Sequence, residues 1–305
     1  MREKIIFLVG ATAIGKSQAA LYLARKLNAE IISCDSMQIY KGMDILTSKL
    51  SSAQKKKIPH HLIDLVNPSK EYNVSRYRVQ AIKQINQIIK KGKVPLFVGG
   101  TGLYMSVLVD GIFKVKADDK KIRGRLEKEA AKCGSDYLYR KLKKVDPLAA
   151  LKIHPNDARR IIRALEVFRV TGKPISQLQR ERKGLGDKYD IRIFCLDMER
   201  EALYKRINAR VEKMFRQGLV REVKKLLKLN LSRTASNAIG IKELKGFFCG
   251  AYDLNAAKGL MQRNTRYYAK RQLTWFRKDK RIQWLKIKDK DSPSYIANKI
   301  FERTD

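Results

Sequence analysis

The chain has 305 residues, of which 44% are hydrophobic, and it carries 67 Lys and Arg against 30 Asp and Glu, a formal net charge of +37 at pH 7. The length fits one α/β core with an inserted lobe, and the apolar content is sufficient to bury that core. No apolar run approaches the roughly 20 residues of a membrane-spanning helix. The four isolated cysteines exclude a paired zinc or redox motif. We therefore expect a soluble, cytoplasmic protein with no membrane partner and no structural metal.

The excess of positive charge predicts a polyanionic partner, and nucleic acid is the favoured one. Basic residues cluster at 263–281, where eight Lys and Arg stand against the single Asp279. Four aromatic residues are interleaved with them, namely Tyr267, Tyr268, Trp275 and Phe276. Cations on phosphates with rings against bases are typical of RNA contact. An amphipathic helix with its aromatics in the core is the alternative, and for the aromatics the pattern favours it somewhat.

The first predicted element is a buried strand at 4–9, which runs directly into Gly10, four further residues and Gly15-Lys16-Ser17. This order of strand, loop and helix is the context that a phosphate-binding loop requires. The glycines allow a tight turn around an anion, helix amides and Lys16 attract it, and Ser17 offers a hydroxyl to magnesium. The complete predicted loop is Gly10, Ala11, Thr12, Ala13, Ile14, Gly15, Lys16 and Ser17. We expect it to bind a diphosphate or triphosphate with Mg²⁺ as cofactor, although kinases, ATPases and transferases all use such loops.

Further strands are predicted at 30–34, 94–98 and 191–196, and helix-length periodic segments separate them. This alternation indicates an α/β fold with a parallel sheet flanked by helices, organised like the P-loop NTPases. Polar clusters follow the second and third strands of the chain: Asp35-Ser36-Met37-Gln38 and Gly99-Gly100-Thr101-Gly102. Because ligands gather at the carboxyl ends of parallel strands, we expect both clusters and the phosphate loop to converge on one crevice.

Asp35 has three open roles. It can take a proton from an incoming nucleophile, it can hold magnesium, or it can cap a helix, and capping is compatible with catalysis. Thr101 stands among three glycines that allow a ligand to approach closely, although an ordinary glycine turn is the alternative. The histidines have no second ligand at metal spacing, and we interpret His60-His61 as a turn without catalytic work.

The pattern changes in the middle of the chain to charged, helix-like sequence. The predicted domains are a core at 1–113 and 191–305 and a mostly helical insertion at 114–190. Within the insertion, Arg159 and Arg163 stand one helical turn apart, while Ile161, Leu165 and Phe168 line another face. This helix can pack and still present guanidinium groups to RNA, and a solvated arginine face is an equally supported interpretation.

Together these motifs resemble the bacterial tRNA dimethylallyltransferases, also called tRNA isopentenyltransferases. The similarity covers nearly the whole chain. The matching segments are GATAIGKS at 10–17, ISCDSMQIYKGMDI at 32–45, PHHLIDLVNP at 59–68, VPLFVGGTGLY at 94–104, IHPNDARRIIRALEVFRVTGKPIS at 153–176, INARVEKMFRQGLVREV at 207–223, AIGIKEL at 238–244 and TRYYAKRQLTWFR at 265–277.

The family transfers the dimethylallyl group from dimethylallyl diphosphate to the exocyclic N6 of the adenosine at position 37, next to the tRNA anticodon. The resemblance implies that dimethylallyl diphosphate and the tRNA anticodon stem-loop are the partners, with no obligate protein partner. It implies catalytic roles for three residues. Lys16 and the loop amides would hold the diphosphate together with magnesium at Ser17, Asp35 would accept the N6 proton, and Thr101 would lie near the adenine.

By the same resemblance, Arg210 is expected near the diphosphate. Contact with tRNA is expected from Asp35, Ser36, Met37, Gln38, Thr101, Arg123, Arg159, Arg160, Ile161, Ile162 and Arg163. The sequence departs from the family pattern at Leu46, Leu50 and Ile241, where glycine, proline and tyrosine are usual, which affects local loop shape and not a catalytic group. Three alternatives remain: a prenyltransferase acting on free adenylate, which the basic insertion disfavours, a nucleotide kinase or ATPase, and a non-enzymatic RNA-binding protein.

Overall fold

The computed structural model describes residues 2–113 and 120–304, and within these ranges the chain forms one six-stranded sheet in the order β3-β2-β4-β1-β5-β6. All neighbouring strands pair in parallel. The strands are β1 (Lys4–Gly10), β2 (Ala29–Ser33), β3 (His60–His61), β4 (Val94–Gly99), β5 (Asp190–Asp197) and β6 (Gln283–Lys286). The four predicted strands are confirmed, and the α/β class with them.

Two short edge strands were not predicted. His60 and His61 pair with Ile31 and Ile32 of β2, so the interpretation of this segment as a turn is wrong. His61 Nε2 also lies 2.8 Å from an oxygen of Glu30, a carboxylate that is only 1% exposed. The second histidine of the pair therefore gives a hydrogen-bond partner to a buried acid, which is a structural role.

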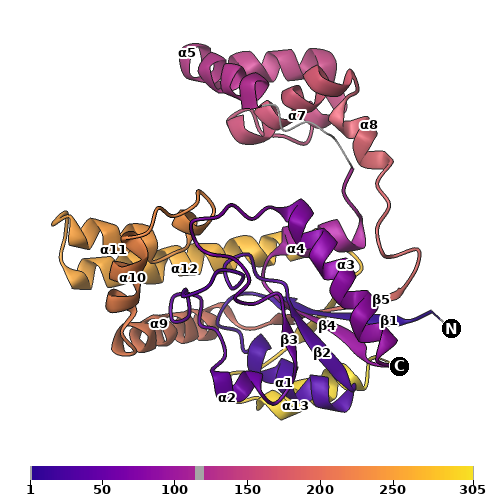
Figure 1. The fold of residues 1–305 in the computed structure, drawn as a ribbon, viewed down its shortest axis with the longest axis vertical. Coiled ribbons are helices and arrows are strands. Elements are labelled where there is room, and N and C mark those ends of the chain that lie inside the picture. The colour runs from indigo at the N-terminus through magenta and orange to yellow at the C-terminus, as the bar shows by residue number, and fades with distance from the viewer. Residues whose placement is uncertain (1, 114–119, 305) are drawn as a thin grey trace. The chain divides into compact units, whose positions relative to one another are not determined.

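The central strand β1 is buried on both faces because helices cover the sheet from both sides. Its apolar run, Ile5 to Val9, is at most 1% exposed, as expected for a strand inside a parallel sheet. Helices α1 (Lys16–Lys26) and α13 (Pro293–Phe301) cover one face, and α3 (Val74–Lys90) and α4 (Gly102–Val109) cover the other (Figure 1). Asn73 begins α3 by accepting a hydrogen bond from the amide of Arg76.

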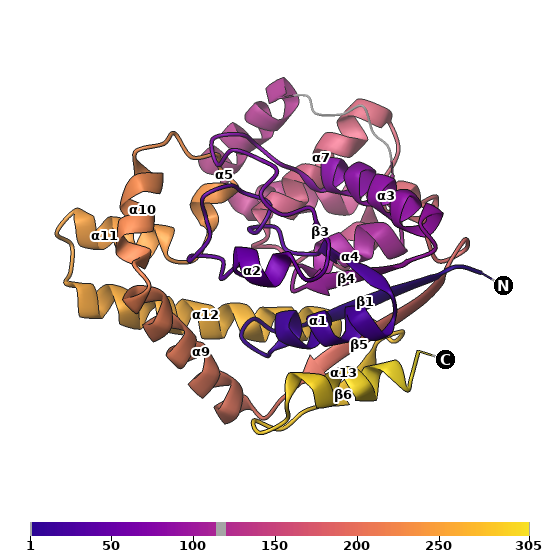
Figure 2. The ribbon, with the colours of Figure 1, turned by 60° about the horizontal axis from the view of Figure 1, so that its bottom comes forward.

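The chain after β5 forms a helical arm that returns to the sheet. The arm consists of α9 (Arg200–Arg216), α10 (Leu219–Leu227), η1 (Ala235–Asn237), α11 (Ile241–Phe248) and α12 (Leu254–Phe276). Figure 2 shows α12 running beside α9 and on towards the sheet, where it also contacts β1 and α4. The short helix α2 (Ser52–Lys55) lies in the loop region after β2. Thus α12 joins the outer arm to the carboxyl ends of the central strands.

The chain divides into two compact units, Met1–Val109 with Gly186–Asp305, and Asp110–Leu185. The described residues of the second unit form α5 (Lys120–Val145), α6 (Pro147–Ala150), α7 (Ala158–Thr171) and α8 (Ile175–Arg180). This unit has a core of its own, which includes Leu126, Leu138 and Leu142 of α5 and Leu165 of α7. Residues 114–119 of the predicted insertion lie outside the described ranges. In those ranges, none of the helices has both the length and the apolar composition to cross a bilayer.

Candidate active site

A cavity of about 1010 Å³ opens at the carboxyl ends of β1, β2 and β4. These strands are neighbours in the sheet, so the loops that follow them meet, as the sequence predicts. The cavity wall combines the phosphate loop, Asp35 and Gln38 after β2, Gly99 and Gly100 after β4, and Arg210 from α9.

The phosphate loop adopts a turn that its glycines permit. Gly10 and Gly15 have φ values of 140° and 104°, and α1 begins directly after Gly15. Lys16 Nζ donates to the carbonyl oxygens of Gly10 at 3.0 Å and Ala11 at 2.6 Å. Thr12 to Ser17 line the cavity, whereas Gly10 and Ala11 lie beneath them and supply these acceptors. Two carbonyl groups of the loop therefore hold the ammonium group of Lys16 at the position where we expect an anion to bind.

Among the charged groups of the cavity wall, Lys16, Arg210 and Asp35 act on one another. Burial and, to a smaller extent, the nearby Arg210 lower the pKa of Lys16 to about 8, although Asp35 opposes both effects. Burial likewise lowers the pKa of Arg210, and Asp35 again opposes it. Arg210 Nη2 also donates to the carbonyl of Thr47 at 3.4 Å. Because both cations are desolvated and share a single carboxylate, an anion with several charges would stabilise this site.

Asp35 caps a turn and also lines the cavity. Its Oδ1 accepts hydrogen bonds from the amides of Met37 at 2.9 Å and Gln38 at 3.4 Å. Gln38 lines the cavity as well, and its Nε2 donates to the carbonyl of Thr47 at 3.3 Å. Ser36 and Met37 are not among the residues that line the cavity. Asp35 therefore caps a turn and not a helix, because the next helix along the chain, α2, begins only at Ser52, and Asp35 lines the same cavity as Lys16. Its role as a proton acceptor or magnesium ligand stays a prediction.

Thr101 is tied to the Asp35 loop and lies beside the cavity wall. Its Oγ1 accepts from the amide of Ser36 at 3.0 Å, and its amide donates to the carbonyl of Cys34 at 3.1 Å. Tyr268 of α12 lies close to the same group, since burial and then Asp35 raise the pKa of this phenol while a hydrogen bond with Thr101 opposes the shift. Thr101, Asp35 and Tyr268 therefore form one polar cluster at the edge of the cavity.

Sequence reasoning missed three residues of the site. Arg206, one turn before Arg210 on α9, donates to the carbonyl of Ile14 at 3.3 Å and pairs with Asp289 at 2.5 Å. The spacing of the two arginines on one helix was a usable signal. Gln272 of α12 lines the cavity, and Glu222 of α10 supports its wall. Neither carries a local signal, because both bind main-chain groups that are distant in the sequence.

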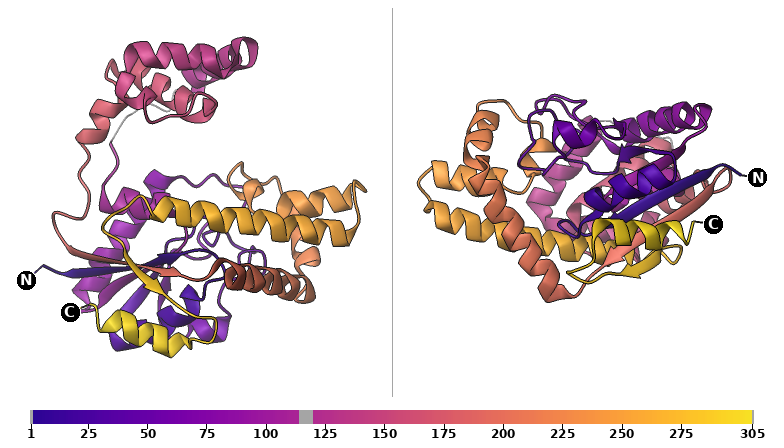
Figure 3. Two further views of the ribbon diagram at one scale, coloured as in Figure 1. Left: turned by 180° about the vertical axis from the view of Figure 1, so that it is seen from behind. Right: turned by 90° about the horizontal axis from the view of Figure 1, so that it is seen from below.

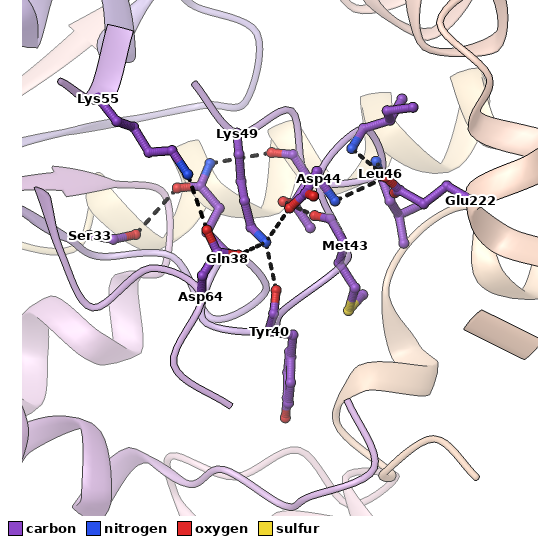
Figure 4. A network of polar contacts seen from close by, with 12 residues as sticks. Ser33, Gln38, Tyr40, Met43, Asp44, Leu46, Lys49, Lys55, Asp64 and Glu222 are labelled. Atoms are coloured by element: carbon purple, nitrogen blue, oxygen red, sulfur yellow. Dashed lines mark hydrogen bonds and ion pairs between the residues drawn. The ribbon is translucent and has the colours of Figure 1, made fainter. Parts of the chain in front are cut away.

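Glu222 holds one cavity loop by its backbone. Its carboxylate oxygens accept hydrogen bonds from three successive amides, those of Asp44 at 3.1 Å, Ile45 at 2.8 Å and Leu46 at 2.8 Å (Figure 4). Such a row of amides is an anion site that the protein fills with its own side chain. The departure from the family pattern at Leu46 therefore falls in a loop whose shape is fixed from outside.

Lys49 is a cation of the cavity wall that is committed to the protein. It donates to the carbonyl of Tyr40 at 2.6 Å, to Asp44 at 2.8 Å and to Asp64 at 2.5 Å, and Lys55 pairs with the same Asp64 at 3.2 Å (Figure 4). Its side chain is 2% exposed. Lys49 thus holds together the loop between β2 and β3. Lys16 and Arg210 differ from it, because they lie close enough within the cavity for the charge of Arg210 to lower the pKa of Lys16.

The oxygen donors of the site fit a magnesium ion bound together with phosphate. Ser17 and Asp35 both line the cavity, and hydroxyl and carboxylate oxygens are ligands that Mg²⁺ accepts. The described part of the chain contains no group of three or more His, Cys, Asp or Glu residues that could hold a metal by itself. An ion at Ser17 would therefore depend on phosphate oxygens to complete its coordination.

The arginines predicted to contact RNA fall into two groups in the helical unit. Arg123 and Arg163 both bind the carboxylate of Glu166, which is fully buried, at 2.9 Å. Arg159 and Arg160 are exposed on α7, where Arg160 pairs with Asp157 at 3.3 Å.

Ile161 lies on the packing face that the sequence predicts for it, and Ile162 is buried with it, while the expected contact of this segment with tRNA stays a prediction. They are 0% and 8% exposed and belong to the core of the helical unit, so their side chains do not face a ligand in solution. Their apolar character is explained by packing between α7 and α5. They hold the helix that carries the exposed arginines.

The aromatic residues of 263–281 are divided between core and surface. Phe276 is fully buried, whereas Tyr267 and Trp275 are 56% and 39% exposed. The pattern favoured core positions for the aromatics, and this holds for Phe276 but not for Tyr267 or Trp275. The basic face of α12 therefore presents two rings to solvent near the polar cluster of Thr101.

A parallel sheet whose central strand leads through a glycine loop into a helix, with a lysine in the loop and a cavity above it, defines an α/β protein with a P-loop NTPase-like fold. The chain belongs to the IPP transferase family, whose model matches residues 38–279, and a model described as isopentenyl transferase matches residues 3–58.

Relatives and crystal structures agree with this family. The chain is 47% identical to a tRNA dimethylallyltransferase of Carboxydothermus hydrogenoformans over 98% of this chain and 97% of that protein. It is 44% identical to the one from Alkaliphilus oremlandii over 99% and 97%. A full-length tRNA isopentenylpyrophosphate transferase from Bacillus halodurans matches with a TM-score of 0.73, 39% identity and coverage of 99% and 97%. A eukaryotic dimethylallyltransferase acting on tRNA matches with a TM-score of 0.80, 33% identity and coverage of 93% and 74%.

Proposed function

We propose that this protein transfers the dimethylallyl group from dimethylallyl diphosphate to N6 of the adenosine at position 37 of tRNA, next to the anticodon, and releases diphosphate. One observation carries the proposal: Lys16, Arg210 and Asp35 meet in a single cavity above the phosphate loop. Two desolvated cations suit a multiply charged leaving group, and the carboxylate beside them suits a proton acceptor. Membership of the IPP transferase family supports the same reaction.

The reaction breaks the allylic carbon–oxygen bond of the donor and forms a carbon–nitrogen bond to N6. Negative charge develops on the diphosphate, where the amides of Thr12 to Ser17, Lys16 and Arg210 stabilise it. The proton that N6 loses passes to Asp35. Ser17 would hold Mg²⁺, which when bound shares the negative charge of the diphosphate. The remaining stabilisation of the diphosphate charge and the removal of the N6 proton are the work of the loop amides, Lys16, Arg210 and Asp35.

The acceptor base must leave the stack of the anticodon loop before its amine reaches the donor. Asp35, Gln38 and Thr101 surround the place where it would enter. Exposed arginines of α7 would bind phosphates of the anticodon stem-loop, and Tyr267 would offer a ring to a base. A tRNA substrate also places the protein in the cytoplasm.

A labelling experiment tests this function. The protein is incubated with magnesium, dimethylallyl diphosphate labelled in its allyl group and tRNA that lacks the modification, and the label is located by nuclease digestion. We expect label on the adenosine next to the anticodon, and none on free AMP supplied in parallel. Labelled AMP with unlabelled tRNA would establish a free-nucleotide prenyltransferase. Steady hydrolysis of ATP without prenyl transfer would establish an ATPase, and either result would overturn the proposal.

A further inference from the structure

Gln272 connects two loops of the site from the side of α12. Its side-chain Oε1 accepts from the amide of Thr12 at 2.9 Å, and its Nε2 donates to the carbonyl of Gly100 at 2.9 Å. The residue is 6% exposed and lines the cavity. Figure 3 shows α12 running from the arm to the sheet, where these loops lie. One buried amide therefore joins the phosphate loop to the residue that precedes Thr101.

The two partners fix the orientation of this amide. A backbone amide of Thr12 can only donate and a carbonyl of Gly100 can only accept, so the oxygen and nitrogen of Gln272 cannot exchange places without losing both bonds. A side-chain amide carries a donor and an acceptor on the same planar end at every pH, and asparagine is one methylene too short to replace glutamine from the same backbone position. The requirement is thus chemical as well as steric.

Gln272 and the two loops that it joins are packed without free space between them. A Cβ atom at Gly100 would lie 1.9 Å from Nε2 of Gln272 and 3.3 Å from the carbonyl oxygen of Gly10. The backbones of the two loops and the side chain of Gln272 are therefore packed to the limit that a glycine allows. A movement of Gln272 would have to move the phosphate loop, the Thr101 loop, or both.

We propose that Gln272 is a positioning residue that sets the distance between the bound diphosphate and the residues that hold the acceptor adenine. It acts through Thr12, whose loop binds the donor, and through Gly100, which precedes Thr101 beside Asp35. This inference rests on the proposed function. It predicts that loss of either hydrogen bond lowers kcat, whereas the KM for tRNA, which depends on the exposed basic surface, stays unchanged.

The test compares Gln272→Glu with Gln272→Met. A glutamate at this place has the same shape, and when protonated it again offers one acceptor and one donor. When ionised it has no donor for Gly100 and brings a negative charge beside the diphosphate. Methionine has neither group at any pH. Gln87→Glu, at an exposed position of α3, adds the same charge away from the site and serves as the matched control.

We expect Gln272→Glu to lower kcat by about 100-fold at pH 8 and Gln272→Met by about 30-fold, as the loss of buried hydrogen bonds predicts. The kcat of Gln272→Glu relative to wild type should rise about tenfold as the pH falls from about 8 to about 5.5, because the new carboxyl group becomes protonated. The ratio for Gln272→Met should stay flat. Lys16, Asp35 and Arg210 face the same space in every variant, so the ratio to wild type removes their contribution.

A binding measurement separates this inference from the proposed function. Titration with inorganic diphosphate should show a weaker affinity for Gln272→Glu that recovers at low pH, and this readout needs no prenyl transfer. If wild type modifies tRNA while both variants keep a kcat near wild type, or Gln272→Glu shows a flat ratio, the inference is wrong and the function stands. If the buried carboxylate prevents Gln272→Glu from folding, Gln272→Met alone tests the inference. An unchanged kcat of this variant would then overturn it. A kcat that falls only in proportion to a rise in the KM for tRNA would overturn it as well.

Discussion

The cavity of the core and the arginine surface of the helical unit use positive charge in opposite ways. In the cavity, burial lowers the pKa of both Lys16 and Arg210. In the helical unit, Arg159 and Arg160 are exposed to solvent. At physiological ionic strength, salt screens exposed charges beyond about 8 Å and screens enclosed charges much less. The same residue types are therefore expected to bind a compact anion through fixed contacts in one region and a polyanion through salt-dependent attraction in the other.

The largest effect should follow from Asp35→Asn, which keeps the shape and the cap but cannot accept a proton. We expect kcat to fall by about 10³-fold, the range of general-base catalysis, while tRNA affinity and the affinity for inorganic diphosphate stay the same or increase. Single-turnover transfer and filter binding measure the two quantities. An equal loss of tRNA affinity would show that the core carboxylate contributes to RNA binding, and the division between the two regions would fail.

Lys16→Met should weaken binding of inorganic diphosphate by about 100-fold, the value of a charge-assisted hydrogen bond in a desolvated site. The pKa of Lys16 is about 8, so its positive charge is complete below pH 8 and is lost as the pH rises through 8. A bound anion favours the charged form, so the protein should take up a proton on binding above pH 8. Calorimetry in buffers of different ionisation enthalpy measures this uptake, and the methionine variant should lack it.

Arg159→Ala should weaken tRNA binding by about fivefold at low salt and reduce the slope of log affinity against log salt by about 1, as one lost phosphate contact predicts. Diphosphate affinity should not change. Arg25→Ala, at an exposed position of α1, removes an identical charge from the core and is the control. Equal slopes for the two variants would mean that net charge, and not the surface of α7, governs RNA binding.

The smallest effect is expected for the stability of Arg160→Ala, which we compare with Arg163→Ala. Arg160 is 62% exposed and its bond to Asp157 spans one turn of α7, so Arg160→Ala should change the free energy of unfolding by less than about 0.5 kcal/mol. Arg163→Ala removes a partner of the buried Glu166 and should cost about 3 kcal/mol. Urea denaturation followed by circular dichroism compares them. Similar losses for both would show that the carboxylate of Glu166 is satisfied by Arg123 alone.

The sequence was sufficient to predict the elements whose residue pattern is visible within one short segment. Four strands were readable because each is an apolar run that ends in polar or glycine residues, and their parallel order brings three loops to one edge. The strand at His60 has two residues, too few to show any period, and its pairing with β2 decides its structure. Glu166 looks like any surface acid of a charged helix, and only tertiary packing buries it. Gln272 and Glu222 bind backbone atoms, and because every residue has these atoms, the sequence does not indicate which residues are their partners.

The three hydrogen bonds that Glu222 accepts from the loop at 44–46 have a consequence for protein engineering. A carboxylate that binds only backbone amides does not depend on the side chains of the residues that it holds, so Ile45 should accept exchange without loss of the cavity wall. Asp44 and Leu46 are more constrained, because Asp44 pairs with Lys49 and a Cβ atom at position 240 would lie 2.5 Å from Cδ1 of Leu46. Chimeras that graft this loop from a relative should therefore carry Glu222 along in every case, and should keep Gly240 wherever a bulky residue follows Ile45.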